Sequence, residues 1–213
     1  MTNNIPPHSR PFAGIGTSAP TPAPFRSDLL VRLRALFNFM IASYSRIMFL
    51  RIDPRFPADR KYPIDNAIFT NFLESYLRNV ERHWGPSTYL WVREKKTTAP
   101  NHHYHIAHFI ALPPEKSEYG VTKGKLFDLS GRLWAKNIGL DPNIPNGLVD
   151  HCEHDLDRFP LGNGVIIDKG NPEWMQRVEY CYQWGTYLAK CYSKEILPQQ
   201  IRSTGSSRLP HQG

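Results

Sequence analysis

The hydrophobic and polar positions of this chain repeat with two spacings, which predict two kinds of element. In four segments apolar residues recur every three or four positions, as on the buried face of a helix. Other segments are short, rich in β-branched and aromatic residues, and end at a proline or a polar turn, as strands do. In chain order we predict helix 27–41, strand 46–53, helix 65–84, strand 87–94, strand 101–110, helix 125–139, strand 148–150 and a helix beginning at Pro172.

The six central elements have the order β-α-β-β-α-β, which is that of the split β-α-β arrangement. We therefore predict an α+β fold with an antiparallel sheet, its helices mainly on one face and its other face free for ligands. The polar connection between strands 87–94 and 101–110 has hairpin length, so these strands should be antiparallel neighbours.

Composition supports a single packed core. The chain has 213 residues, of which 40% are hydrophobic and 12% aromatic. We expect one folded domain over residues 27–195, between a Pro-rich disordered tail at 1–26 and a disordered basic tail at 196–213. The formal net charge of +7 favours phosphate-rich partners without identifying one.

The cysteines and the hydropathy of the chain indicate the cellular compartment in which it works. The three cysteines have no spacing typical of a disulfide framework, which favours a reducing environment. No apolar run approaches the length of a membrane span, and the N-terminus lacks the apolar core of a signal peptide. We expect a cytoplasmic protein with no membrane partner.

Strand 101–110 contains four histidines and is the best candidate for metal chemistry. Side chains alternate along a strand, so His103 and His105 point to one face, and His102 and His108 to the other. Across the predicted hairpin, Glu94 can lie opposite His103 or His105. Two imidazoles and one carboxylate are a set found at catalytic metal centres. The alternative is a strand whose imidazoles are only hydrogen-bonded.

Tyr187 is the candidate nucleophile. It lies nearly opposite the apolar face of the last predicted helix, on a stripe shared with Lys190 and Lys194. One interpretation is a solvent-exposed aromatic residue among helix-end cations, which the helix dipole favours. The other is a nucleophile, since a phenol with a pKa near 10 reacts at neutral pH when positive charge, a metal or a base eases its deprotonation. Lys190 could supply that charge or hold a phosphate oxygen.

Taken together, these motifs resemble those of the HUH endonucleases, the rolling-circle replication initiators and relaxases. His103-Tyr104-His105 with Glu94 resembles their metal motif, and Tyr187-Leu188-Ala189-Lys190 resembles their tyrosine motif. Residues 51–57 resemble their first strand motif. Over residues 30–195 the chain looks most similar to YagK/YfjJ-type proteins, which include replication proteins of filamentous phages (inoviruses).

This resemblance implies a mechanism. His103 and His105, with Glu94, would hold Mg²⁺ or Mn²⁺, which polarises the scissile phosphate of single-stranded DNA or an origin hairpin. Tyr187 would attack that phosphate and leave a 5′-phosphotyrosine and a free 3′-hydroxyl, so that a later hydroxyl can rejoin the strand. The process implied is initiation of rolling-circle replication of a phage or mobile element. Two-tyrosine initiators have a second tyrosine where this chain has Cys191, which favours a one-tyrosine enzyme.

The remaining candidates have supporting roles. Arg51 and Lys194 are predicted DNA contacts, and Asp53, at the end of its strand, could approach the metal site. The chain has no helicase-type phosphate loop, so strand separation would need a host helicase. Two other hypotheses stay open: a non-catalytic nucleic-acid-binding or regulatory protein on the same fold, and a metal-dependent hydrolase that uses water instead of Tyr187.

Overall fold

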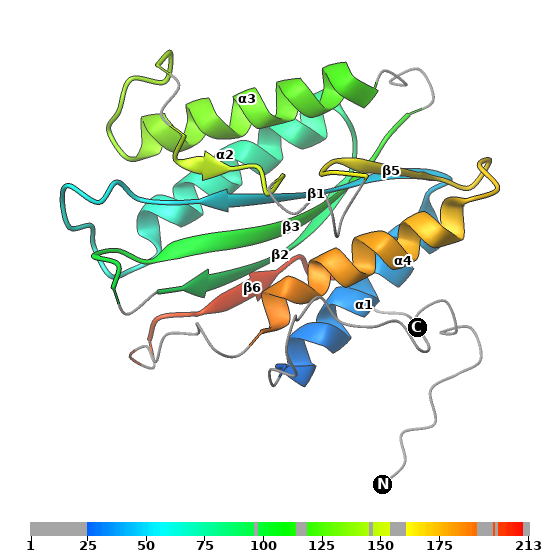
Figure 1. The fold of residues 1–213 in the computed structure, drawn as a ribbon, viewed down its shortest axis with the longest axis horizontal. Helices are drawn as coiled ribbons and strands as arrows, with labels where there is room; N and C mark the ends of the chain where they lie inside the picture. The colour runs from blue at the N-terminus through cyan, green and yellow to red at the C-terminus, as the bar shows by residue number, and fades with distance from the viewer. Residues whose placement is uncertain are drawn as a thin grey trace, which may run out of the picture.

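The computed structural model describes residues 25–95, 98–113, 119–144, 147–153, 161–190, 198 and 200–210. Its elements follow one another as shown in Figure 1. They are α1 (Ser27–Ser43), β1 (Arg46–Pro54), α2 (Ala67–His83), β2 (Ser87–Glu94), β3 (His103–Ala111), α3 (Tyr119–Asn137), β4 (Val149–Asp150), β5 (Val165–Asp168), α4 (Trp174–Gly185), the 3₁₀ helix η2 (Thr186–Ala189) and β6 (Thr204–Ser206).

A six-stranded antiparallel sheet forms the centre of the fold. Its order is β4-β1-β3-β2-β6, and β5 pairs with β1 on the same side as β4. The order β4-β1-β3-β2 is the one that the split β-α-β arrangement gives, because each helix connection skips one strand position. The predicted α+β fold, the antiparallel sheet and the hairpin between β2 and β3 are therefore confirmed.

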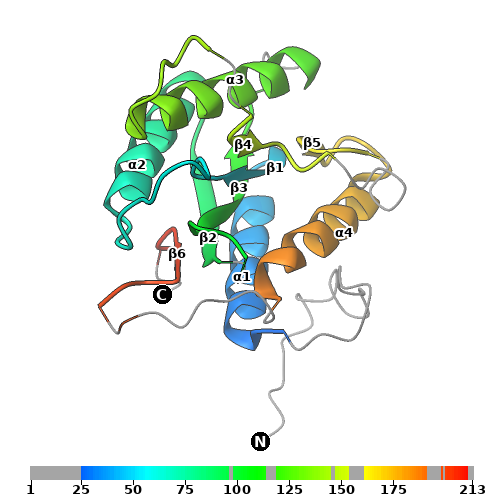
Figure 2. The same ribbon diagram turned by 60° about the vertical axis from the view of Figure 1, so that its left-hand side comes forward.

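Helices cover both faces of this sheet, so the prediction that one face stays free is wrong. Figures 1 and 2 show α2 and α3 on one side of the sheet and α1 and α4 on the other. The reason lies in the central strands, whose side chains are apolar on both faces. In β1, Phe49 packs against α1, whereas Met48 and Leu50 pack in the core with α2 and α3. A strand of this kind must be covered on both sides.

The C-terminal segment belongs in part to the sheet, so the predicted disordered tail at 196–213 is wrong for β6. Leu90 to Val92 of β2 pair with Ser206 to Thr204. Gly205 permits this pairing, because a Cβ atom there would lie 2.6 Å from Nε1 of Trp91. The pairing covers the edge of β2 beside the predicted metal site. At the other end, residues 1–24 of the predicted N-terminal tail lie outside the described residues.

The helix boundaries also differ from the predicted ones. α3 begins at Tyr119 rather than residue 125, and α4 begins at Trp174 rather than Pro172. α4 ends at Gly185, and η2 carries the next four residues, so Tyr187 lies on a 3₁₀ turn that continues the helix. Within the described part of the chain, no helix is long and apolar enough to cross a membrane.

Candidate metal and tyrosine site

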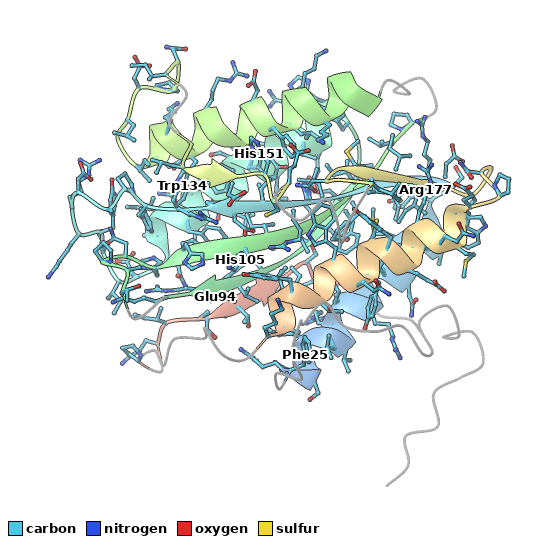
Figure 3. All side chains as sticks on the ribbon, in the orientation of Figure 1. Phe25, Glu94, His105, Trp134, His151 and Arg177 are labelled. Atoms are coloured by element: carbon cyan, nitrogen blue, oxygen red, sulfur yellow. The ribbon has the colours of Figure 1, made fainter. Side chains whose placement is uncertain are left out.

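Three side chains predicted as metal ligands meet where β2 ends and β3 begins. The register pairs Glu94 directly with His103, and His105 follows two residues later on the same face of β3. One ligand atom from each of these residues lies within 4.8 Å of the other two. Figure 3 shows Glu94 and His105 on these neighbouring strands. The predicted convergence of the three donors is confirmed.

The distances within this group suit a shared ion. Nε2 of His105 lies 3.2 Å from Oε2 of Glu94, and Nε2 of His103 lies 4.0 Å from the same oxygen. The side chains of Glu94 and His105 are almost fully buried, whereas 12% of the His103 side chain is exposed. A ligand would therefore approach the group from the side of His103.

Asp53 lies directly behind His105. Oδ2 of Asp53 is 2.6 Å from Nδ1 of His105, on the side of the ring away from Glu94. Although burial disfavours its ionisation, His105 and Arg51 hold the pKa of Asp53 well below its usual range. A carboxylate behind a histidine fixes the orientation of the ring, as at many metal sites. Asp53 therefore approaches the candidate ligands, as its place at the end of β1 predicted.

The two histidines have opposite electrostatic environments. Burial lowers the pKa of His103 to about 4, and the neighbouring His105 adds to this shift. Burial acts in the same direction on His105, but Asp53 and Glu94 outweigh it and raise the pKa of His105. His103 is therefore neutral near pH 7, with a ring nitrogen lone pair available to a ligand. The negative charge beside His105 is the kind that a bound cation would neutralise.

The residues fit a divalent cation. Both ring nitrogens of His105 are buried, and neither makes a hydrogen bond of regular geometry in the described part of the chain, although each faces a carboxylate. A metal ion between His103, His105 and Glu94 would satisfy the nitrogen that faces Glu94. Imidazole nitrogens favour ions such as Zn²⁺, and carboxylate oxygens favour Mg²⁺ or Mn²⁺, so this mixed set is compatible with several divalent ions.

Tyr187 lies directly beside this group. Its ring centroid is 5.1 Å from that of His105, at an interplanar angle of 67°. Two cations lie over the ring: Cζ of Arg51 at 4.3 Å and Nζ of Lys190 at 4.1 Å from the centroid. Tyr187 is half-buried and Lys190 is buried, so the interpretation as a solvent-exposed aromatic residue among surface cations does not describe this site.

Backbone contacts fix the turn that carries Tyr187. The chain leaves η2 in an extended conformation at Lys190, with φ −60° and ψ 138°. There Lys190 forms an antiparallel bridge with Phe25, and the amide of Arg26 donates to the carbonyl of Ala189 at 2.8 Å. The segment that precedes α1 thus holds the end of the tyrosine turn.

Seven of the eight predicted site residues lie together in the structure. They are Arg51, Asp53, Glu94, His103, His105, Tyr187 and Lys190. The eighth, Lys194, lies outside the described residues. Arg51 was predicted as a DNA contact, but its side chain is buried beneath Tyr187 rather than presented to solvent.

The other two histidines of the strand make structural contacts on the opposite face. His102 contacts the hydroxyl of Tyr104 at 3.0 Å, and His108 contacts the hydroxyl of Tyr76 at 3.3 Å. Both contacts lie among the side chains of α2 and its neighbours. The structure therefore places His102 and His108 on the face opposite to His103 and His105, as strand alternation predicted.

The sequence analysis did not predict a role for Asn163. This residue fixes the backbone of Arg51, the first residue of the segment 51–57. Its side-chain oxygen accepts a hydrogen bond from the amide of Arg51 at 2.8 Å, and its side-chain nitrogen donates to the carbonyl of the same residue. Asn163 is fully buried in a loop that ends at Gly164, whose φ is +77°. An Asn-Gly pair signals a turn, but nothing in the sequence says what that turn contacts.

One family model matches most of the chain. The family model described as the YagK/YfjJ C-terminal domain matches residues 23–207, so the chain belongs to this family. The matched range includes β6, the three candidate metal ligands and Tyr187. No curated protein and no solved structure matches the chain.

Proposed function

We propose that this protein is an HUH-type, metal-dependent endonuclease that nicks and rejoins single-stranded DNA through Tyr187. In this proposal it initiates rolling-circle replication of a phage or mobile element. One observation carries the proposal. The ring of Tyr187, which two cations flank, contacts His105, one of three residues that could hold a metal. These two residues are 82 positions apart in the sequence.

The charges of the site support an anionic substrate. Asp53 and Glu94 contribute two negative charges, and Arg51 and Lys190 contribute two positive charges. A divalent ion bound to the candidate ligands would leave the site positive, which attracts a phosphodiester. When bound, that ion would supply a Lewis acid for the phosphoryl oxygens.

The protein's own residues would carry out the transfer of the phosphoryl group. The phenolic oxygen of Tyr187 forms a bond to phosphorus while the bond from phosphorus to the 3′ oxygen breaks. The phenolic proton leaves through solvent, and the departing 3′ oxygen takes up a proton, so the charges balance. Lys190 and Arg51, which lie over the ring of Tyr187, stabilise the negative charge that develops on the phenolic oxygen. The reverse step, in which a 3′-hydroxyl attacks the phosphotyrosine, rejoins the strand.

The decisive experiment is the capture and mapping of a covalent adduct. We would incubate the protein with Mn²⁺ and a pool of randomised single-stranded DNA, isolate protein-linked DNA under denaturing conditions, and locate the modified residue by mass spectrometry. We expect the adduct on Tyr187, and expect chelation or Tyr187→Phe to abolish it. Tyr180→Phe is the matched control, because Tyr180 lies two turns earlier and donates to the carbonyl of Gly162.

The outcomes separate the competing functions. Cleavage without an adduct would identify a hydrolase that uses water. DNA binding that is insensitive to chelator and to His103→Ala, with no cleavage, would identify a non-catalytic binding protein. An adduct that persists in Tyr187→Phe would show that the nucleophile is another residue.

A further inference from the structure

Four side chains form a closed set of contacts between the candidate nucleophile and the candidate metal site. Arg51 lies over the ring of Tyr187 at 4.3 Å, and its guanidinium is 3.3 Å from Asp53. Asp53 is 2.6 Å from His105, and the ring of His105 returns to Tyr187 at 5.1 Å. Tyr187 is therefore connected to a metal ligand directly and also through two residues of β1.

The sheet determines this arrangement. Arg51 and Asp53 are two residues apart on β1, so their side chains share a face. The register that pairs Ile52 with Ile106 continues to place Asp53 opposite His105. Asn163 holds both backbone groups of Arg51, which leaves the base of that side chain little freedom.

The buried position of Arg51 points to a role beside Tyr187. Only 4% of its side chain is exposed, and its Nε atom has no hydrogen-bond partner in the described part of the chain. Its carboxylate partner is Asp53. A guanidinium is a planar cation that suits the face of an aromatic ring, and that of Arg51 lies over the ring of Tyr187.

We infer that Arg51 is the positioning residue of Tyr187, and that Asp53 links it to His105 so that the state of the metal site reaches the tyrosine. This inference rests on the proposed function for its consequence in catalysis. Its structural content is separate: occupation of the metal site changes the environment of the Tyr187 ring, and that change depends on Arg51.

The test reports on the ring itself. We would incorporate 3-fluorotyrosine at position 187 and record ¹⁹F NMR spectra during titration with Mg²⁺, which is diamagnetic. We expect one narrow resonance that moves as the metal binds. In Arg51→Gln we expect a shifted or broadened resonance with a much smaller response to Mg²⁺. Arg46→Gln is the matched control. Arg46 lies on the same strand as Arg51 but at the other end of β1, where it pairs with Asp168.

Two further measurements distinguish positioning from a general structural role. Because no metal ligand changes, Arg51→Gln should bind Mg²⁺ within about threefold of the wild type by calorimetry, while its rate of adduct formation falls by roughly 10- to 100-fold. Arg51→Lys keeps the charge but loses the planar face, and should recover only part of that rate. If Arg51→Gln does not fold, the same comparisons are made with Arg51→Lys.

Three outcomes would count against the inference or against the proposed function. An unchanged ¹⁹F spectrum and adduct rate in Arg51→Gln would overturn the inference, as would a loss of metal affinity equal to the loss of rate. Absence of an adduct in the wild-type protein would count against the proposed function alone. The ¹⁹F response to Mg²⁺ would then still decide whether Arg51 connects the two parts of the site.

Discussion

His108 makes the stability of this fold depend on pH in a way that can be calculated. Its side chain is fully buried in β3 and contacts the hydroxyl of Tyr76 at 3.3 Å. Burial lowers the pKa of His108 to about 3, whereas an imidazole in the unfolded chain titrates near 6.5. Between these two values the unfolded chain binds a proton that the folded protein does not. Stability therefore falls as the pH falls below about 6.5.

The size of the effect follows from the two pKa values. At pH 5.5, protonation of His108 in the unfolded chain lowers the free energy of unfolding by about 1.4 kcal/mol, and at pH 7.5 by less than about 0.1 kcal/mol. With a typical urea dependence of about 2 kcal/mol per molar, this equals a shift of roughly 0.7 M in the unfolding midpoint.

Urea unfolding of His108→Asn, followed by tryptophan fluorescence in the presence of chelator, measures this contribution. Asparagine retains a polar partner for Tyr76 but does not titrate. The variant is expected to be less stable at pH 7.5, because it leaves unfilled volume, yet to lose about 1.4 kcal/mol less than the wild type on going to pH 5.5. His83→Asn, at an exposed position at the end of α2, should lose as much as the wild type. Equal losses in His108→Asn and the wild type would refute the reasoning.

Two other predictions concern the edge strand and the metal. Gly205→Val should displace β6, because its side chain would collide with Trp91, and cost roughly 1–3 kcal/mol of stability in thermal unfolding. Gly131→Ala in α3, where no atom lies within 4 Å, should be neutral or stabilising, and a stable Gly205→Val protein would contradict the packing argument. Mn²⁺ should raise the melting temperature of the wild type, and His103→Ala should weaken Mn²⁺ binding at least tenfold by calorimetry. His102→Asn, on the opposite face of the sheet, should bind Mn²⁺ normally, and an unaltered affinity in His103→Ala would exclude it as a ligand.

The local pattern of the chain was enough to predict the central part of the fold. The helical periodicity is preserved in the structure because each helix buries its apolar face against the sheet. β5 and β6 were not predicted, since four and three residues are too few to show a period. The second helical layer was also missed. Strands that are apolar on both faces need cover on both, but the order of elements does not say which face each helix takes.

The sequence by itself determined which three side chains form the candidate metal-binding group. Strand alternation separates His103 and His105 from the other two histidines, and a hairpin with a fixed register brings Glu94 to them, so local geometry suffices. Only the tertiary structure decided the other half. Tyr187 reaches His105 because α4 and η2 pack on a face of the sheet that we had expected to be open, and Arg51 is buried beneath Tyr187 of η2. Contacts between residues so far apart in the chain depend on how whole elements pack, which no local pattern encodes.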